Sequence, residues 1–185
     1  MQAVIRWGAI AASAMPGLAL AHAGGAQAGG VQSASFLASI IHPFTSLDHI
    51  VVAALLVLVT LRRHNTIPWL PGALFISGVA LGFLTVMVGA RFEFAEYLYY
   101  TLIVLLMISF FRPRRVIPSL CLTVVALLGL SQGHAHGLTT ELIDPTQCLC
   151  GIGLALGTLG VAALLALPVR HIYKRLPILQ AQPTA

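Results

Sequence analysis

The sequence predicts an all-α integral membrane protein, a bundle of about five transmembrane helices after an N-terminal signal peptide, with the first helix broken near Pro43. Composition is the first reason. Hydrophobic residues make up 58% of the 185 residues and charged residues only 8%, with a mean hydropathy of +0.95; a soluble domain averages about 25% charged residues. The second reason is five apolar stretches, each near the roughly 17–25 residues that cross a bilayer. They lie at about 36–61, 72–90, 95–111, 116–133 and 148–168.

Residues 1–21 resemble a secretory signal peptide. Arg6 is their only charged residue, an apolar run follows, and a Pro-Gly pair precedes the small-residue site "ALA" at 19–21. Cleavage there would leave a single transmembrane domain, 22–185, that begins with His22. An uncleaved first membrane helix is the alternative, because the apolar run approaches spanning length.

The first apolar stretch contains the unusually polar segment "HPFTSLDH", residues 42–49. Pro43 is disfavoured inside a helix, and Thr45 followed three residues later by Asp48 is a capping-box pattern that opens a new helix. A helix over Ser46–Leu61 would be about 24 Å long, which is short of a hydrocarbon core of about 30 Å. The break is therefore expected within the outer leaflet, where irregular backbone must be buried or line a cavity. Broken helices of this kind form ion sites in transporters.

His42, Asp48 and His49 bring imidazole and carboxylate groups to this break. Mixed nitrogen and oxygen ligands suit borderline divalent metals, and an ionisable residue inside a membrane indicates a functional site. Two alternatives stay open: Asp48 could serve only as the capping acid, and His42 could be an interfacial histidine. His49 lies beyond the cap in an apolar run, so a ligand role explains it best.

The next stretches carry fewer polar groups. Pairs of glycines four residues apart, Gly78 with Gly82 in the second stretch and Gly153 with Gly157 in the fifth, predict close helix packing. Glu96 begins the third stretch, either as an N-terminal acid favoured by the helix dipole or as a metal ligand.

The fourth stretch ends in "QGHAHG", residues 132–137. On a helix His134 and His136 would diverge, whereas in a glycine-flanked loop both could turn toward one ion. A bare His-x-His pair is more often a solvated loop, but this pair falls on the same side of the membrane as His42 and His49. We therefore expect both histidines at a metal site.

The basic residues predict the orientation of the bundle. They follow the first, third and fifth stretches, and the opposite ends of the stretches carry only Arg91. The expected topology has the mature N-terminus outside and the C-terminus in the cytoplasm of a bacterial inner membrane. The residues that mark the cytoplasmic side are Arg62, Arg63, Arg112, Arg114, Arg115, Arg170, Lys174 and Arg175. His22 then lies on the outer side with the other candidate ligands.

Together these motifs resemble the HupE/UreJ family of small membrane proteins, regarded as nickel or cobalt permeases linked to hydrogenase and urease maturation. The first family motif, approximately HPxxGxDH, reads "HPFTSLDH" here, and the later motif, approximately HGxAHGxE, reads "QGHAHGLTTE". A glutamate that opens the third span is a further family feature. The resemblance covers the whole mature chain and implies metal-site roles for His42, Asp48, His49, Glu96 and His136.

The chain departs from the family pattern at several positions. Ser46 replaces the motif glycine, Gln132 replaces the first histidine of the later motif, and Thr139 stands in place of its glutamate. Glu141 or His134 is a candidate to compensate. The last span also lacks a histidine that the family often carries.

The resemblance implies a secondary transporter for a divalent transition-metal ion, nickel or cobalt, taken up from the outer side. The ion is then the transported substrate, and no prosthetic group is expected. The alternative is a membrane-bound metal-binding accessory or assembly factor that does not transport. An enzyme is not expected, since the chain has no HExxH motif and no nucleophile with an obvious base.

The expected partners are the metal ion, the lipid bilayer and, through function, a nickel or cobalt enzyme system. No nucleic acid is expected, because no basic patch alternates with aromatic residues. Five spans make a small bundle for a pore, which leaves a homo-oligomer open.

Overall fold

A computed structural model describes residues 36–62, 67–110, 118–138 and 146–176. The predicted signal peptide and His22 lie outside these residues. Within them there are six helices and no strand, which confirms the all-α prediction. The helices are α2 (Phe36–Thr45), α3 (Leu47–Arg62), α4 (Leu70–Met87), α5 (Ala95–Ser109), α6 (Pro118–Leu138) and α7 (Thr146–Arg175).

The helices follow the predicted apolar stretches in order. By length and composition, α4 and the Leu149–Arg175 part of α7 can each cross a membrane. The α2–α3 pair adds a third candidate span if the two helices are counted together, and α5 is a shorter apolar helix. The described residues thus contain two or three candidate spans.

The predicted break in the first span is present. α2 and α3 differ in direction by 78°, and the break falls at Ser46. Pro43 lies inside α2 and not at the break. The Thr45 hydroxyl closes the last turn of α2 by donating a hydrogen bond to the His42 carbonyl oxygen, 3.0 Å away. α3 starts directly afterwards, with the Ile50 N–H bonded to the Ser46 carbonyl oxygen at 3.1 Å.

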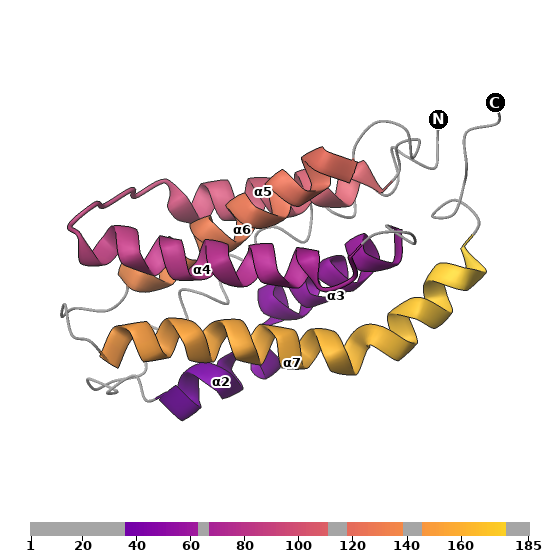
Figure 1. Ribbon diagram of the computed structural model, residues 1–185, viewed down its shortest axis with the longest axis horizontal. Coiled ribbons are helices and arrows are strands. Elements are labelled where there is room, and N and C mark those ends of the chain that lie inside the picture. Colours follow the sequence, from indigo (N-terminus) through magenta and orange to yellow (C-terminus); the bar gives the residue numbers. More distant parts are fainter. Residues whose placement is uncertain (1–35, 63–66, 111–117, 139–145, 177–185) are drawn as a thin grey trace.

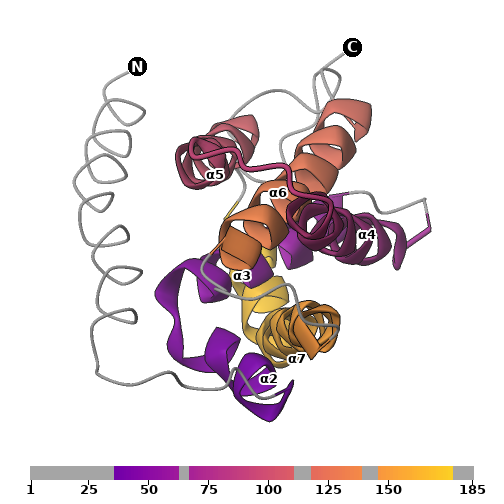
Figure 2. The same ribbon diagram turned by 90° about the vertical axis from the view of Figure 1, so that its left-hand side faces the viewer.

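The helices form a bundle in which α6 packs between α4 and α5, while α7 packs along α2 and α3 (Figures 1 and 2). α4, α5 and α7 run along the long axis of the bundle, and α7, which contains Pro168, bends toward its C-terminal end (Figure 1).

Glycines bring α4 and α6 into backbone contact. Gly78 and Gly82 of α4 face Gly129 and Gly133 of α6, and a Cβ atom added to any of the four would overlap backbone atoms of the opposite helix. This confirms the packing role predicted for the α4 pair. The α6 surface that faces α4 thus contains a glycine pair as well.

The packing role predicted for the second glycine pair is also confirmed, because α2 packs against these two glycines of α7. A Cβ atom at Gly153 would lie 2.9 Å from the Phe36 carbonyl oxygen. A Cβ atom at Gly157 would overlap the Ile40 carbonyl oxygen. The glycines therefore set the separations of the helix pairs α4–α6 and α2–α7.

We expect Gly133→Ala to lower the thermal unfolding midpoint of the protein in detergent, because the new methyl group must push α6 away from α4. Overpacking of this kind typically costs about 1–3 kcal/mol. Gly72→Ala is the matched control, since its Cβ would lie at an ordinary contact distance of 3.5 Å from Leu159. Equal midpoints for the two variants would contradict the packing role of Gly133.

Candidate metal centre

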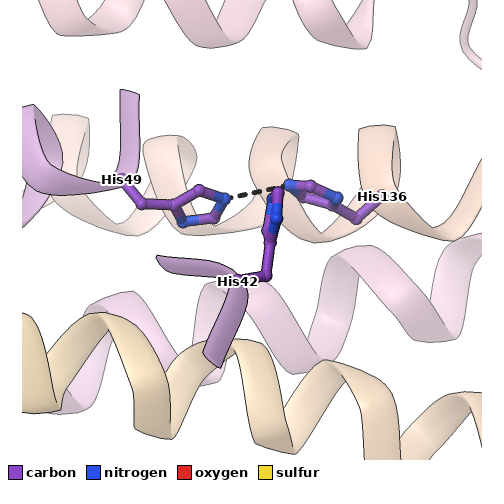
Figure 3. Close-up of side chains that lie close together, drawn as sticks. All are labelled: His42, His49 and His136. Atoms are coloured by element: carbon purple, nitrogen blue, oxygen red, sulfur yellow. Dashed lines mark hydrogen bonds between the residues drawn. The ribbon is translucent and has the colours of Figure 1, made fainter. Parts of the chain in front are cut away.

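Three histidines from three helices converge on one point. His42 comes from the end of α2, His49 from the start of α3 and His136 from the last turn of α6. One ring nitrogen from each lies within 4.8 Å of the others. Figure 3 shows the His42 ring between those of His49 and His136, whose Nε2 atoms are 3.2 Å apart. The three ring nitrogens form a set of ligand atoms large enough to hold a metal ion.

The break at Ser46 is what brings His42 and His49 together. Seven residues of continuous helix would separate them by about 10.5 Å along the axis. With the 78° bend, their ring centroids are 5.0 Å apart. The polar motif in the first span therefore works as a turn that folds one ligand back onto the other.

The separations suit one transition-metal ion. Metal–imidazole bonds of about 2.0–2.1 Å in a tetrahedral site place two ligand nitrogens about 3.3 Å apart. The 3.2 Å between His49 and His136 already meets this requirement. The ring nitrogen of His42 lies within 4.8 Å of the other two and would have to move closer to complete the site. Imidazole ligands suit nickel, zinc or copper better than magnesium or calcium.

His49 is the most enclosed of the three ligands, with no exposed surface. Its Nδ1 atom lies 2.6 Å from Gln132 Nε2 on α6 and 3.3 Å from Thr158 Oγ1 on α7. Histidine ligands commonly donate their second ring N–H to an acceptor that fixes the orientation of the ring, a role that the oxygen of Thr158 can fill but the amide nitrogen of Gln132 cannot. The sequence had marked Gln132 only as a departure from a motif. Its position one helical turn before His136 is the signal that places it on the same face of α6.

Asp48 is fully buried beside the three histidines. Its Oδ2 atom accepts a hydrogen bond from the Tyr99 hydroxyl of α5 at 3.3 Å, and lies 3.8 Å from His49 Nε2. A buried carboxylate needs such partners. Asp48 therefore links α5 to the neighbourhood of the site.

His134 points to a different set of partners. Its Nδ1 atom lies 2.7 Å from Thr85 Oγ1, and its Nε2 atom accepts the Phe92 N–H at 2.9 Å. The interpretation of "QGHAHG" as a loop is wrong, because α6 is helical through Leu138. His134 and His136 consequently diverge, and His134 joins α6 to α4 and to the segment before α5.

Two other predicted ligands are not in the three-histidine group. Glu96 is partly exposed in the first turn of α5, outside that group. His22 lies outside the described residues, as does Glu141. Their roles as ligands stay predictions.

A family model described as HupE / UreJ protein matches residues 10–180, most of the chain. The chain belongs to the HupE/UreJ family. Membership implies a role in nickel or cobalt transport or an accessory role in the handling of these metals. Comparisons with curated proteins and with solved structures find no match. In this HupE/UreJ protein the two sequence motifs meet in space, the first through His42 and His49 and the second through His136.

We expect His49→Ala to weaken the binding of Ni²⁺ or Co²⁺ to the purified protein. Loss of a side chain that merely supports a ligand costs roughly 10–100-fold in affinity, so loss of the ligand itself should cost at least as much. Titration calorimetry in detergent measures the effect. His134→Ala is the histidine control, expected to lower thermal stability while leaving affinity near that of the wild type. Loss of metal affinity in His134→Ala with unchanged affinity in His49→Ala would instead place the site at His134.

Proposed function

We propose that this HupE/UreJ protein is a secondary permease that takes up a divalent transition-metal ion, nickel or cobalt, from the outer side to the cytoplasm. The observation that supports it most is the convergence of His42, His49 and His136 at a bend between apolar helices. Irregular backbone of this kind is tolerated at membrane depth where it lines a site or cavity. The ion is the cargo, so the ligands must also release it.

The charge distribution supports inward transport through a five-span bundle with its N-terminus outside. Arg62 at the end of α3 donates a hydrogen bond to the Ser109 carbonyl oxygen at the end of α5, 2.7 Å away. Arg62 is thirteen residues after His49, or about 20 Å along the helix axis. Basic residues favour the cytoplasmic side, so in this orientation the histidines lie toward the outside.

An open groove lies on the basic side, between α3, α4 and α7, with a volume of about 650 Å³. Most of its lining side chains are apolar, and the polar ones are Thr60 and Arg170. It begins at Leu56 on α3, which is about 10.5 Å along the axis from His49. Two helical turns thus separate the histidines from this groove.

The membrane potential is large enough to drive uptake. A divalent ion that moves inward across 100 mV gains about 4.6 kcal/mol, twice the 2.3 kcal/mol of one elementary charge. At 1.4 kcal/mol per decade, this supports roughly a thousandfold accumulation. The chain has no Walker-type phosphate loop, so a potential-driven mechanism suits it.

One observation favours the alternative, a metal-binding accessory factor that does not transport. The turns of α3 between the histidines and the groove carry buried apolar side chains, Val52, Ala53 and Leu55. An accessory factor needs the outer ligands but no route past these side chains.

We expect liposomes that contain the protein to take up radioactive nickel or cobalt when a negative interior potential is imposed. Uptake should fall to the level of empty liposomes in His49→Ala. His171→Ala is the matched control, because His171 is exposed at the basic end of α7 and should leave uptake unchanged. If the wild-type protein binds metal but shows no flux, the hypothesis of an accessory factor should replace that of a permease.

A further inference from the structure

The groove on the basic side is a gap in the packing of three helices. Its walls come from α3, α4 and α7, and α3 packs along α7 but contacts α4 only sparsely. Its volume of about 650 Å³ lies within the range of about 300–1,000 Å³ that is typical of small-molecule sites. Small residues in the lining account for its depth, namely Gly72, Ala73, Ala162 and Ala166.

The length of the groove corresponds to one leaflet of a bilayer. Along α7 the lining runs from Leu159 to Arg170, which is eleven residues or about 16.5 Å of helix. Half of a hydrocarbon core of about 30 Å is about 15 Å. The lining residues of α7 recur every three or four positions, which places them on one face of the helix: Leu159, Ala162, Ala166 and Arg170. An acyl chain of one leaflet therefore fits lengthwise along this face.

The lining of the groove is suited to hydrocarbon. Apart from Thr60 and Arg170, its side chains are apolar. The Thr60 hydroxyl already donates a hydrogen bond to the Leu56 carbonyl oxygen at 2.9 Å, so it needs no further acceptor. In a membrane, a groove with this lining is filled by an acyl chain or by a helix of another protein.

A positive charge marks one end of the groove. Thr158 of α7 contacts His49 of α3, and twelve residues further along each helix the lining contains Arg170 and Leu61. Both residues therefore lie toward the basic end. Trp69, directly before α4, also lines the groove and is 66% exposed. Tryptophan is enriched where a membrane meets water, so this end is expected at the level of the lipid headgroups.

The charge at this end has no acidic counterpart within the described helices. Their acidic residues are Asp48 and Glu96, which lie in the first turns of α3 and α5, away from the basic ends of these helices. Arg62 is already engaged with the Ser109 carbonyl oxygen, whereas Arg170 is exposed in the groove. Lys174 and Arg175 follow one turn later. An anionic group from outside these helices would complement this charge.

We propose that the groove binds one anionic phospholipid, with an acyl chain along α3, α4 and α7 and the phosphate at Arg170. Basic pockets between transmembrane helices bind anionic lipid headgroups in this way. The start of α4 adds to the attraction, because it has no side-chain cap and carries the positive end of the helix dipole. The lipid fills the gap between α4 and α3, the helix that carries His49.

A second copy of the chain fits the groove less well than a lipid. In a two-fold dimer the same surface faces itself, so a groove-to-groove contact would bring two copies of Arg170 together. Like charges repel more strongly in a medium of low dielectric constant, and no acidic residue of the described helices lies at this end to separate them. An anionic phospholipid supplies both the hydrocarbon and the negative charge.

Native mass spectrometry of the full-length protein in detergent tests the charged end of the site. The probes are phosphatidylglycerol, which is anionic, and phosphatidylcholine with the same acyl chains. We expect the wild type to retain one phosphatidylglycerol in preference to phosphatidylcholine. Arg170→Gln should weaken this binding roughly fivefold, the contribution of one basic residue near an anionic surface. Arg91→Gln is the matched control, because Arg91 is exposed beyond the opposite end of α4 and should leave binding unchanged.

A second pair of variants tests the acyl chain. Ala162→Phe fills the groove but keeps Arg170, and it should reduce phosphatidylglycerol binding to the level of phosphatidylcholine. Ala163→Phe is the matched control, since Ala163 is exposed on α7 outside the groove. Added phosphatidylglycerol should raise the thermal unfolding midpoint of the wild type and of Ala163→Phe, but not that of Ala162→Phe. Ala166→Phe serves if the Ala162 variant does not fold.

Equal retention of the two lipids by the wild type would overturn the lipid site. Phosphatidylglycerol binding that survives both Arg170→Gln and Ala162→Phe would also overturn it, because the lipid would then bind elsewhere. A dimer in light scattering that Ala162→Phe dissociates, with no lipid retained by the wild type, would assign the groove to a second copy. None of these readouts involves a metal ion, so failure of the lipid site and failure of the permease are distinguishable.

Discussion

Contact between helix backbones at glycine is the constraint on which the histidine site depends. A metal ion tolerates deviations of only about 0.2 Å in its ligand distances, yet the three ligands come from three helices. Gly133 sets the separation of α6 from α4, and Gly157 sets that of α2 from α7. A methyl group at either position would overlap a backbone carbonyl oxygen of the opposite helix, so the helix that carries a ligand would have to move. The glycine pairs therefore act on metal binding from outside the site.

The break in the first span places polar groups where the membrane disfavours them, and the fold compensates for each group separately. The Asp48 carboxylate is buried but accepts from Tyr99, and His49 is buried between Gln132 and Thr158. The compensating groups come from α5, α6 and α7, so the polar bend is stable only once the bundle has formed. Functional sites typically depart from the local sequence preferences of a fold, and tertiary contacts elsewhere offset the cost in stability.

The apolar stretches, the break and both predicted glycine pairs were predictable because each depends on residues close in sequence. His42 and His49 could be placed together for the same reason, because one motif carries both. The meeting of His136 with them joins residues 87 positions apart, and it was expected only from the predicted topology and the family resemblance. The loop predicted at residues 132–137 was wrong because Gly133 and Gly137 were interpreted as breaks in a helix. Both glycines instead accommodate α4, Gly133 at Val79 and Gly137 at Val86. The contacts of Gln132 and Thr158 with His49 join residues 83 and 109 positions apart, and no local pattern indicates them.

The relation between the site and the groove follows from the two helices that they share. Thr158 of α7 contacts His49, and the next residue, Leu159, lines the groove. On α3, His49 belongs to the site and Leu56 to the groove. Between the two spaces α3 carries buried apolar side chains, and α3 packs against α7. A path past these side chains would require α3 and α7 to separate. The contact of Thr158 with His49, at 3.3 Å, joins these same two helices, so any such movement would act directly on the neighbour of a proposed ligand.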